Sequence, residues 1–240
     1  MRSDVVERLL EINENFYAGL ARPFARTRAR PQPGFERLLD YVPVGPGRLL
    51  DLGCGEGRFG RFFLAHFPAV DYVGVDASAP LLERAHQTLP GRFYQRNLMD
   101  EGALRGLGRF DVVSLLAVLQ HIPGHANRLR LLRTIAGHMR AKGRLFVSTW
   151  QFMDSARQRR KLVDWSEVAL TPDDVEGGDY LLTWRSGGFG IRYVAYIDPQ
   201  EMHELTTAAG YGVVDQFRSD GKEGDLNLYT VLEPLGDNSA

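Results

Sequence analysis

Apolar and polar residues follow two different periods along this chain, one typical of helices and one typical of buried strands. Over residues 4–20, apolar side chains recur at helical spacing between glutamate and arginine residues, which predicts an amphipathic helix capped by Ser3. Residues 22–34 are rich in arginine and proline, so a regular helix cannot run through all of them. A second short helix is predicted over residues 34–42. We therefore expect residues 1–45 to form a helical lid.

From residue 46 onward, short apolar runs alternate with amphipathic segments. The amphipathic segments predict helices at 58–66, 79–89 and 125–141. Repeated β–α units indicate a parallel sheet with helices on both faces, so residues 46–150 are expected to form a Rossmann-like α/β core. The predicted strands of this core are 48–52, 71–75, 92–95, 111–116 and 144–149.

Residues 151–196 break the alternation. A basic run at 157–161 precedes an acidic run at 173–176 and a Gly-Gly pair, and we interpret the segment as a substrate-recognition insertion that ends in a strand near 191–197. Residues 197–235 then complete the core with a helix at 199–209 and strands at 212–218 and 226–232. The short link between these two strands suits a hairpin, so the last strand is expected to be antiparallel in a seven-stranded, mostly parallel sheet.

Composition excludes several classes of protein. The 240 residues are 44% hydrophobic and 25% charged, as in an ordinary globular domain. The single cysteine, Cys54, rules out a disulfide scaffold and is typical of a reducing compartment, so we expect a cytoplasmic protein. No apolar run approaches the roughly 20 residues of a membrane span. The net charge of −1 argues against a DNA-binding protein, and the histidine spacings predict no metal site.

A glycine-rich loop joins the first core strand to the next helix. Gly53, Gly55 and Gly57 follow Asp51, and such glycines allow a sharp turn and a close approach of the backbone to a ligand. The spacing Gly55-x-Gly57-x-x-Gly60 also fits a dinucleotide fingerprint. However, a carboxylate at Asp51 would repel a pyrophosphate, whereas it could bind the ammonium of a methionine group directly or through water. We therefore predict S-adenosylmethionine as the cofactor, with NAD as the alternative.

Other candidate residues follow the next strands of the core. Asp76 ends the second strand, where a carboxylate can accept hydrogen bonds from both hydroxyls of a ribose. Asn97 and Leu98 follow the third strand and could contact the edge and face of an adenine. His121 follows the fourth strand, at the edge where open α/β sheets bind ligands.

These motifs carry a family resemblance. The run Asp51-Leu-Gly-Cys-Gly-Glu-Gly57, together with Asp76 and the edge Leu119–Pro123, resembles a class I S-adenosylmethionine-dependent methyltransferase over residues 46–150 and the last helix and strands. The resemblance implies a transferase that leaves S-adenosyl-L-homocysteine as product. The expected cofactor-binding residues are Tyr17, Asp51, Gly53, Gly55, Gly57, Asp76, Ala77, Asn97, Leu98 and Ala117.

A narrower resemblance includes the N-terminal segment. It is to the tRNA wobble-uridine carboxymethyl methyltransferases, which esterify 5-carboxymethyluridine, and it implies a tRNA acceptor and an activating partner subunit. The matching positions are Tyr17, Phe24, Thr27-Arg28, Pro31, Pro33, His121, Trp150 and Arg192-Tyr193. The chain departs from the family pattern at Gln32, Gln120 and Ala195, all in the predicted substrate region, so a different acceptor stays open.

The chemistry of the acceptor sets the expected catalytic groups. A carboxylate acceptor needs cations that position it, while an amine or hydroxyl needs a base, for which His121 is the candidate. Abundant arginine near the predicted mouth favours an anionic acceptor. The alternatives are a small-molecule O- or N-methyltransferase and a non-catalytic cofactor-binding protein. We predict Arg28, His121 and Arg192 as catalytic residues, and Arg30, Trp150 and Tyr193 as substrate contacts.

Overall fold

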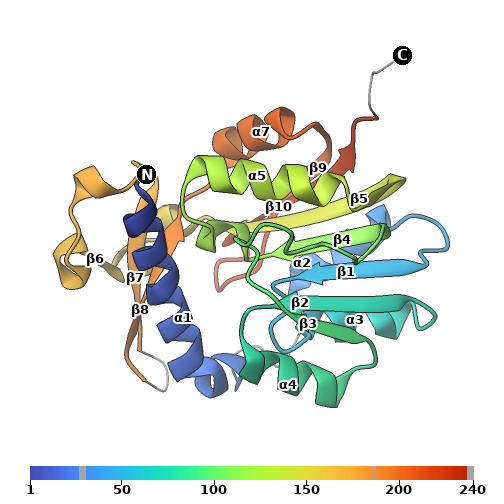
Figure 1. Ribbon diagram of the computed structural model, residues 1–240, viewed down its shortest axis with the longest axis horizontal. Coiled ribbons are helices and arrows are strands. Elements are labelled where there is room, and N and C mark those ends of the chain that lie inside the picture. The colour runs from blue at the N-terminus through green and yellow to red at the C-terminus, as the bar shows by residue number, and fades with distance from the viewer. Residues whose placement is uncertain (27–30, 186–187, 237–240) are drawn as a thin grey trace.

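The structure is a computed structural model that describes residues 1–26, 31–185 and 188–236 (Figure 1). Its centre is a seven-stranded sheet with the strand order β3-β2-β1-β4-β5-β10-β9. The strands are β1 (Arg48–Leu52), β2 (Asp71–Asp76), β3 (Arg92–Gln95), β4 (Phe110–Leu116), β5 (Met139–Trp150), β9 (Tyr211–Ser219) and β10 (Asn227–Pro234).

Strand directions in this sheet follow the predicted pattern. β1 pairs in parallel with β2 and β4, and the pairs β2–β3 and β4–β5 are parallel as well. β10 lies between β5 and β9 and is antiparallel to both. The predicted Rossmann-like sheet with an antiparallel last strand is therefore confirmed.

Helices cover both faces of the sheet. On one face, α5 (His125–Ala136) and α7 (Pro199–Ala208) contribute buried apolar side chains to the larger core cluster. On the other face, α2 (Pro33–Leu38), α3 (Arg58–His66) and α4 (Ala79–Thr88) pack around a second cluster that is rich in phenylalanine. The helices thus pack against the two faces of the sheet. The carboxyl ends of the parallel strands are where open α/β sheets bind ligands.

Two helix boundaries differ from the sequence prediction. The helix predicted to reach residue 141 ends at Ala136, because β5 begins at Met139 and pairs with Phe110 of β4. The first helix, α1, covers Ser3–Arg26, so Ser3 is a helical residue and the helix continues through Pro23. The expectation that this regular helix ends before segment 22–34 is therefore wrong up to Arg26.

The insertion forms a small antiparallel sheet of its own. Its strands are β6 (Leu162–Val163), β7 (Asp179–Trp184) and β8 (Gly190–Ala195), preceded by the short helix α6 (Ala156–Arg159). Figure 1 shows α1 running between this small sheet and the main one. Asn13 of α1 accepts a hydrogen bond at its Oδ1 from the N–H of Tyr193 on β8 at 2.9 Å. The division into lid, core and insertion stays a prediction.

Candidate active site

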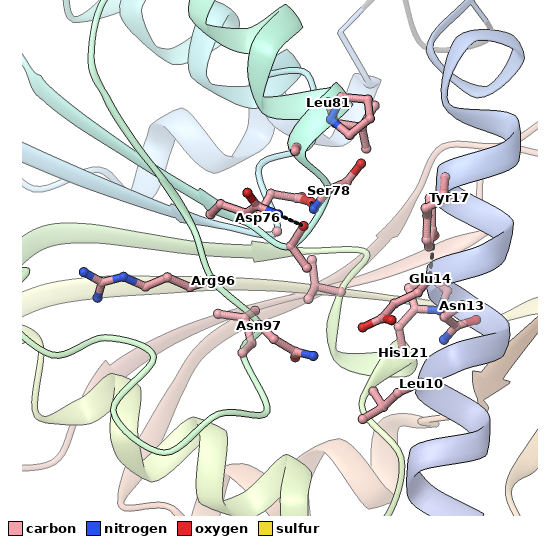
Figure 2. Close-up of a pocket in the computed structure, with 18 of the residues that line it drawn as sticks. Leu10, Asn13, Glu14, Tyr17, Asp76, Ser78, Leu81, Arg96, Asn97 and His121 are labelled. Carbon is pink, nitrogen blue, oxygen red and sulfur yellow. Dashed lines mark hydrogen bonds between the residues drawn. The ribbon is translucent and has the colours of Figure 1, made fainter.

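A cavity of about 530 Å³ lies between α1 and the carboxyl ends of the central strands (Figure 2). Its volume is within the range of small-molecule sites. The main sheet contributes Gly53, residues 76–81, residues 95–98, and the segment after β4. From α1 come Leu10, Asn13, Glu14, Tyr17 and Ala18.

Asp76 presents its carboxylate at the cavity wall in a fixed orientation. Its Oδ2 accepts a hydrogen bond from the N–H of Gly55 and its Oδ1 one from the N–H of Ser78, both at 2.8 Å. Burial raises the pKa of the Asp76 carboxyl, and these backbone donors oppose that shift. Each oxygen keeps acceptor capacity for a ligand. The predicted contact with two ribose hydroxyls fits this geometry.

The glycine loop reaches the cavity at its first glycine. Gly53 has a φ of +66°, and a Cβ there would lie 2.3 Å from Cγ2 of Val118. Glycine is therefore required for both the turn and the close packing at this position. Gly55 and Gly57 shape the same turn but are not among the residues that line the cavity.

Asp51 lies behind the loop and does not line the cavity. It is 3% exposed, and its Oδ1 accepts a hydrogen bond from Ser114 Oγ at 2.7 Å while Oδ2 accepts one from Tyr72 Oη at 2.9 Å. Burial raises the pKa of Asp51 to about 6, against the effect of these two hydroxyls. A direct contact with a methionine ammonium does not fit this placement, because hydroxyls of Tyr72 and Ser114 on the neighbouring strands already bind both carboxylate oxygens. The predicted contact through water stays a prediction.

We expect Asp51 to make the free energy of unfolding depend on pH. Its folded pKa of about 6 exceeds the ordinary value of 3.8, so its stabilising contribution is complete below pH 3.8 and is lost as the pH rises through 6. The gap corresponds to roughly 3 kcal/mol at most. Urea unfolding of the wild type and of Asp51→Asn from pH 4 to 8 measures this: the stability of the wild type relative to the variant should fall with rising pH. Parallel profiles would contradict the prediction.

The other predicted cofactor residues all line the cavity. Ala77, Asn97, Leu98, Ala117 and Tyr17 are among its wall residues. Asn97 Oδ1 accepts a hydrogen bond from the N–H of Met99 at 2.9 Å, and Figure 2 shows the side-chain nitrogen pointing into the cavity. An adenine edge would find a donor there, so the predicted role of Asn97 fits its position.

Tyr17 and His121 form a hydrogen-bonded pair at the cavity wall. Tyr17 Oη lies 3.0 Å from His121 Nε2, and His121 Nδ1 lies 3.0 Å from the carbonyl oxygen of Tyr193. Because a carbonyl only accepts, Nδ1 carries the proton, and in the neutral ring Nε2 accepts from the Tyr17 hydroxyl. Nε2 is the nitrogen that a general base would use, and it already accepts a hydrogen bond from the Tyr17 hydroxyl. A methyl acceptor in the cavity would therefore contact the Tyr17 hydroxyl before it could reach His121.

Arg192 lies on β8 next to Tyr17, outside the cavity wall. Its guanidinium carbon is 4.2 Å from the ring centroid of Trp150 and 5.3 Å from that of Phe16, and the side chain is 6% exposed. Within the described part of the chain, its Nε and Nη1 have no hydrogen-bond partner. Burial lowers the pKa of Arg192, and the neighbouring Tyr17 opposes this shift. A buried cation without an anion is costly, so this side chain is suited to bind an anionic group.

Of the described residues predicted to contact substrate or to act in catalysis, Trp150 and Tyr193, like Arg192, do not line the cavity. Tyr193 is fully buried and its hydroxyl donates a hydrogen bond to Asp179 Oδ1 at 2.7 Å, which disagrees with the predicted substrate contact. Arg28 and Arg30 lie outside the described residues. Trp150 is not a wall residue either, but it packs edge-on against His121 with ring centroids 5.3 Å apart and lies beneath Arg192.

Sequence reasoning missed most of the α1 contribution. Leu10, Asn13, Glu14 and Ala18 share one helix face with Tyr17, and only their spacing of three and four residues could have indicated it. In the ranges that the structure describes, no three His, Cys, Asp or Glu residues gather as a metal ion would need, and no helix has the length and apolarity to cross a membrane.

Comparison with known proteins identifies a family over most of the chain. Residues 24–216 match the family described as a methyltransferase domain. Trans-aconitate 2-methyltransferase of Methylobacterium nodulans is 36% identical over 115 residues, which are 47% of this chain and 43% of that protein. A putative methyltransferase of Encephalitozoon cuniculi is 28% identical over 226 residues, 91% of this chain and 93% of that protein. The chain thus spans less than half of the first relative and nearly all of the second.

Solved structures share the fold at low identity. An S-adenosylmethionine-dependent methyltransferase of Clostridium acetobutylicum superposes with a TM-score of 0.65 at 14% identity, over 93% of this chain and 100% of that one. A cofactor-bound amino pentose methyltransferase of Micromonospora echinaspora gives 0.60 at 19% identity, over 86% and 94%.

Proposed function

The chain belongs to the methyltransferase domain family, and from this premise we propose that it transfers the methyl group of S-adenosylmethionine to a carboxylate. S-adenosylmethionine is the cofactor, and the cavity residues suit it: Asp76 for the ribose, Asn97 and Leu98 for the adenine, and Gly53 for the close approach of the ligand. The observation that carries the carboxylate acceptor is the buried guanidinium of Arg192, which has N–H groups without partners beside Tyr17.

The side chains around Arg192 suit a reaction that moves no proton. S-adenosylmethionine supplies an electrophilic methyl group, which an ionised carboxylate accepts without a base. Arg192 would hold the acceptor through charge-assisted hydrogen bonds, with its plane set by Trp150. His121 would keep the Tyr17 hydroxyl oriented at the boundary between cofactor and acceptor. Together, α1 and the small sheet would exclude water from the aligned groups.

Two kinds of carboxylate are candidates. The trans-aconitate relatives act on a small polycarboxylic acid, but their match covers only about half of this chain. The Encephalitozoon relative matches nearly end to end. The second candidate carboxylate is a carboxymethyl group on a tRNA wobble uridine, and with it we propose an activating partner subunit. The arginine-rich segment 22–30 favours this candidate, because arginine side chains suit contacts with RNA phosphates.

Methyl transfer with radiolabelled cofactor tests this proposal. The protein is incubated with trans-aconitate, with other di- and tricarboxylic acids, or with total tRNA, and half of each product is treated with mild alkali. A methyl ester loses its label in alkali, so we expect alkali-labile label in one pool, which identifies the carrier.

Alkali-stable label would contradict a carboxylate acceptor and favour an amine, ring or ribose atom. No label in any pool, despite thermal stabilisation by S-adenosylhomocysteine, would favour a non-catalytic binding protein. Stabilisation by NADH instead would overturn the cofactor assignment.

A further inference from the structure

One carboxylate at the cavity wall was not indicated by any sequence motif, and it comes from α1. Glu14 lines the cavity beside Asn13 and Tyr17. Figure 2 shows its side chain extending from α1 into the cavity on the side of Asn97. Within the described ranges, Glu14 has no hydrogen-bond or ion-pair partner. Its charge therefore faces whatever fills the cavity.

The neighbouring Asn13 shows that this helix face is built toward a ligand. Its Oδ1 is held by the N–H of Tyr193 at 2.9 Å, which fixes the amide plane. Its Nδ2 has no partner within the described ranges, although the residue is only 6% exposed and lines the cavity. Buried donors are nearly always satisfied, so a ligand in the cavity is the natural acceptor.

Charges of opposite sign are separated in this site. Glu14 and Asp76 are both wall residues, while Arg96 donates its Nη1 hydrogen bonds to the carbonyls of Ala103 and Arg105. Figure 2 shows Arg96 pointing away from the cavity. Arg192 lies outside the wall. The cavity itself is therefore negative, and the buried positive charge lies on the acceptor side.

Methyl transfer removes the positive charge of the cofactor, and the negative charges at the cavity wall would bind the two forms with different affinity. The bond from methyl carbon to sulfur breaks, its electron pair stays on sulfur, and a bond to the acceptor oxygen forms. The sulfonium thereby becomes a neutral thioether. Glu14 is exposed, and a sphere of the cavity's volume is about 10 Å across, against a Debye length of about 8 Å at physiological ionic strength. Its effect on a bound charge should therefore be strongest at low ionic strength, where salt screens it least.

We propose that Glu14 is a specificity-determining residue that holds the charged cofactor more tightly than its neutral product. The negative cavity favours S-adenosylmethionine before transfer and weakens the hold on S-adenosylhomocysteine afterwards. This inference rests on the proposed cofactor and is independent of the identity of the acceptor.

Binding measurements with three ligands test the inference. Calorimetry compares the wild type with Glu14→Gln for S-adenosylmethionine, for S-adenosylhomocysteine, and for sinefungin, which carries a protonated amine near the sulfonium position. We expect Glu14→Gln to weaken both cationic ligands about fivefold and to leave the neutral product within about twofold. Glu11→Gln is the matched control, because Glu11 lies one turn earlier, pairs with Arg8 at 2.7 Å, and does not line the cavity.

The outcomes separate this inference from the proposed function. Equal weakening of all three ligands would overturn charge discrimination and place Glu14 on the adenosine or in the support of α1. Unchanged affinities would overturn it as well. Failure of the wild type to bind any of the three would instead refute the proposed cofactor. Melting temperatures of both variants check that the exposed glutamates do not affect folding.

Discussion

Replacing Asp76 by alanine is expected to abolish cofactor binding while the protein still folds. The carboxylate is held by the N–H groups of Gly55 and Ser78, and its remaining lone pairs are the proposed acceptors for two ribose hydroxyls. Hydrogen bonds to a charged group contribute about 1.5–3 kcal/mol each, so losing two should raise the Kd at least about 100-fold. Calorimetry with S-adenosylhomocysteine measures the loss directly.

The control for this change lies on the same strand. Asp71 begins β2 at the opposite edge of the sheet, where it pairs with Arg48 and Arg92, so Asp71→Ala should keep the wild-type affinity. Asp76→Asn retains the side-chain shape and separates the contribution of the charge. An unchanged Kd in Asp76→Ala would exclude Asp76 as a ribose ligand.

The second large effect is expected at Arg192. Arg192→Gln should lower kcat/KM for the carboxylate acceptor about 100-fold or more, because losing one partner of a buried charge-assisted contact costs roughly 2–5 kcal/mol. Arg192→Lys keeps the charge but loses the planar fork above Trp150, so an intermediate effect is expected. The affinity for S-adenosylhomocysteine should stay within about twofold in both variants. Steady-state kinetics and calorimetry together provide these values.

An exposed arginine gives the matched control. Arg140 is 52% exposed and pairs with Asp111 at the other end of β4, so Arg140→Gln should leave turnover unchanged. If Arg192→Gln lowered turnover and product affinity equally, Arg192 would belong to the cofactor site. Full activity in Arg192→Gln would refute its role. If Arg192→Gln does not fold, Arg192→Lys keeps the test decisive because it preserves the stacked cation.

Local sequence patterns predicted the frame of the site well. Gly53, Gly55 and Gly57 all have positive φ values just after β1. Three alternating glycines directly after a predicted strand indicate such a turn, so residues 51–57 were sufficient to predict it. Asp76 follows from the place of the next strand end. The antiparallel β10 follows from the short connection to β9. The end of α5 was misplaced because helical periodicity continues past Ala136, whereas Met139 pairs with Phe110, a partner distant in sequence.

The sequence by itself thus determined the order of β–α units and the edge of the sheet where the cavity lies, since each depends on neighbours along the chain. Only the tertiary structure decided which polar groups remain available to a ligand. Asp51 is bound by Tyr72 and Ser114 of adjacent strands, while Glu14 faces the cavity and Arg192 lies among aromatic rings without an anion. Partners for buried charges come from segments far apart in sequence, so periodicity cannot assign them.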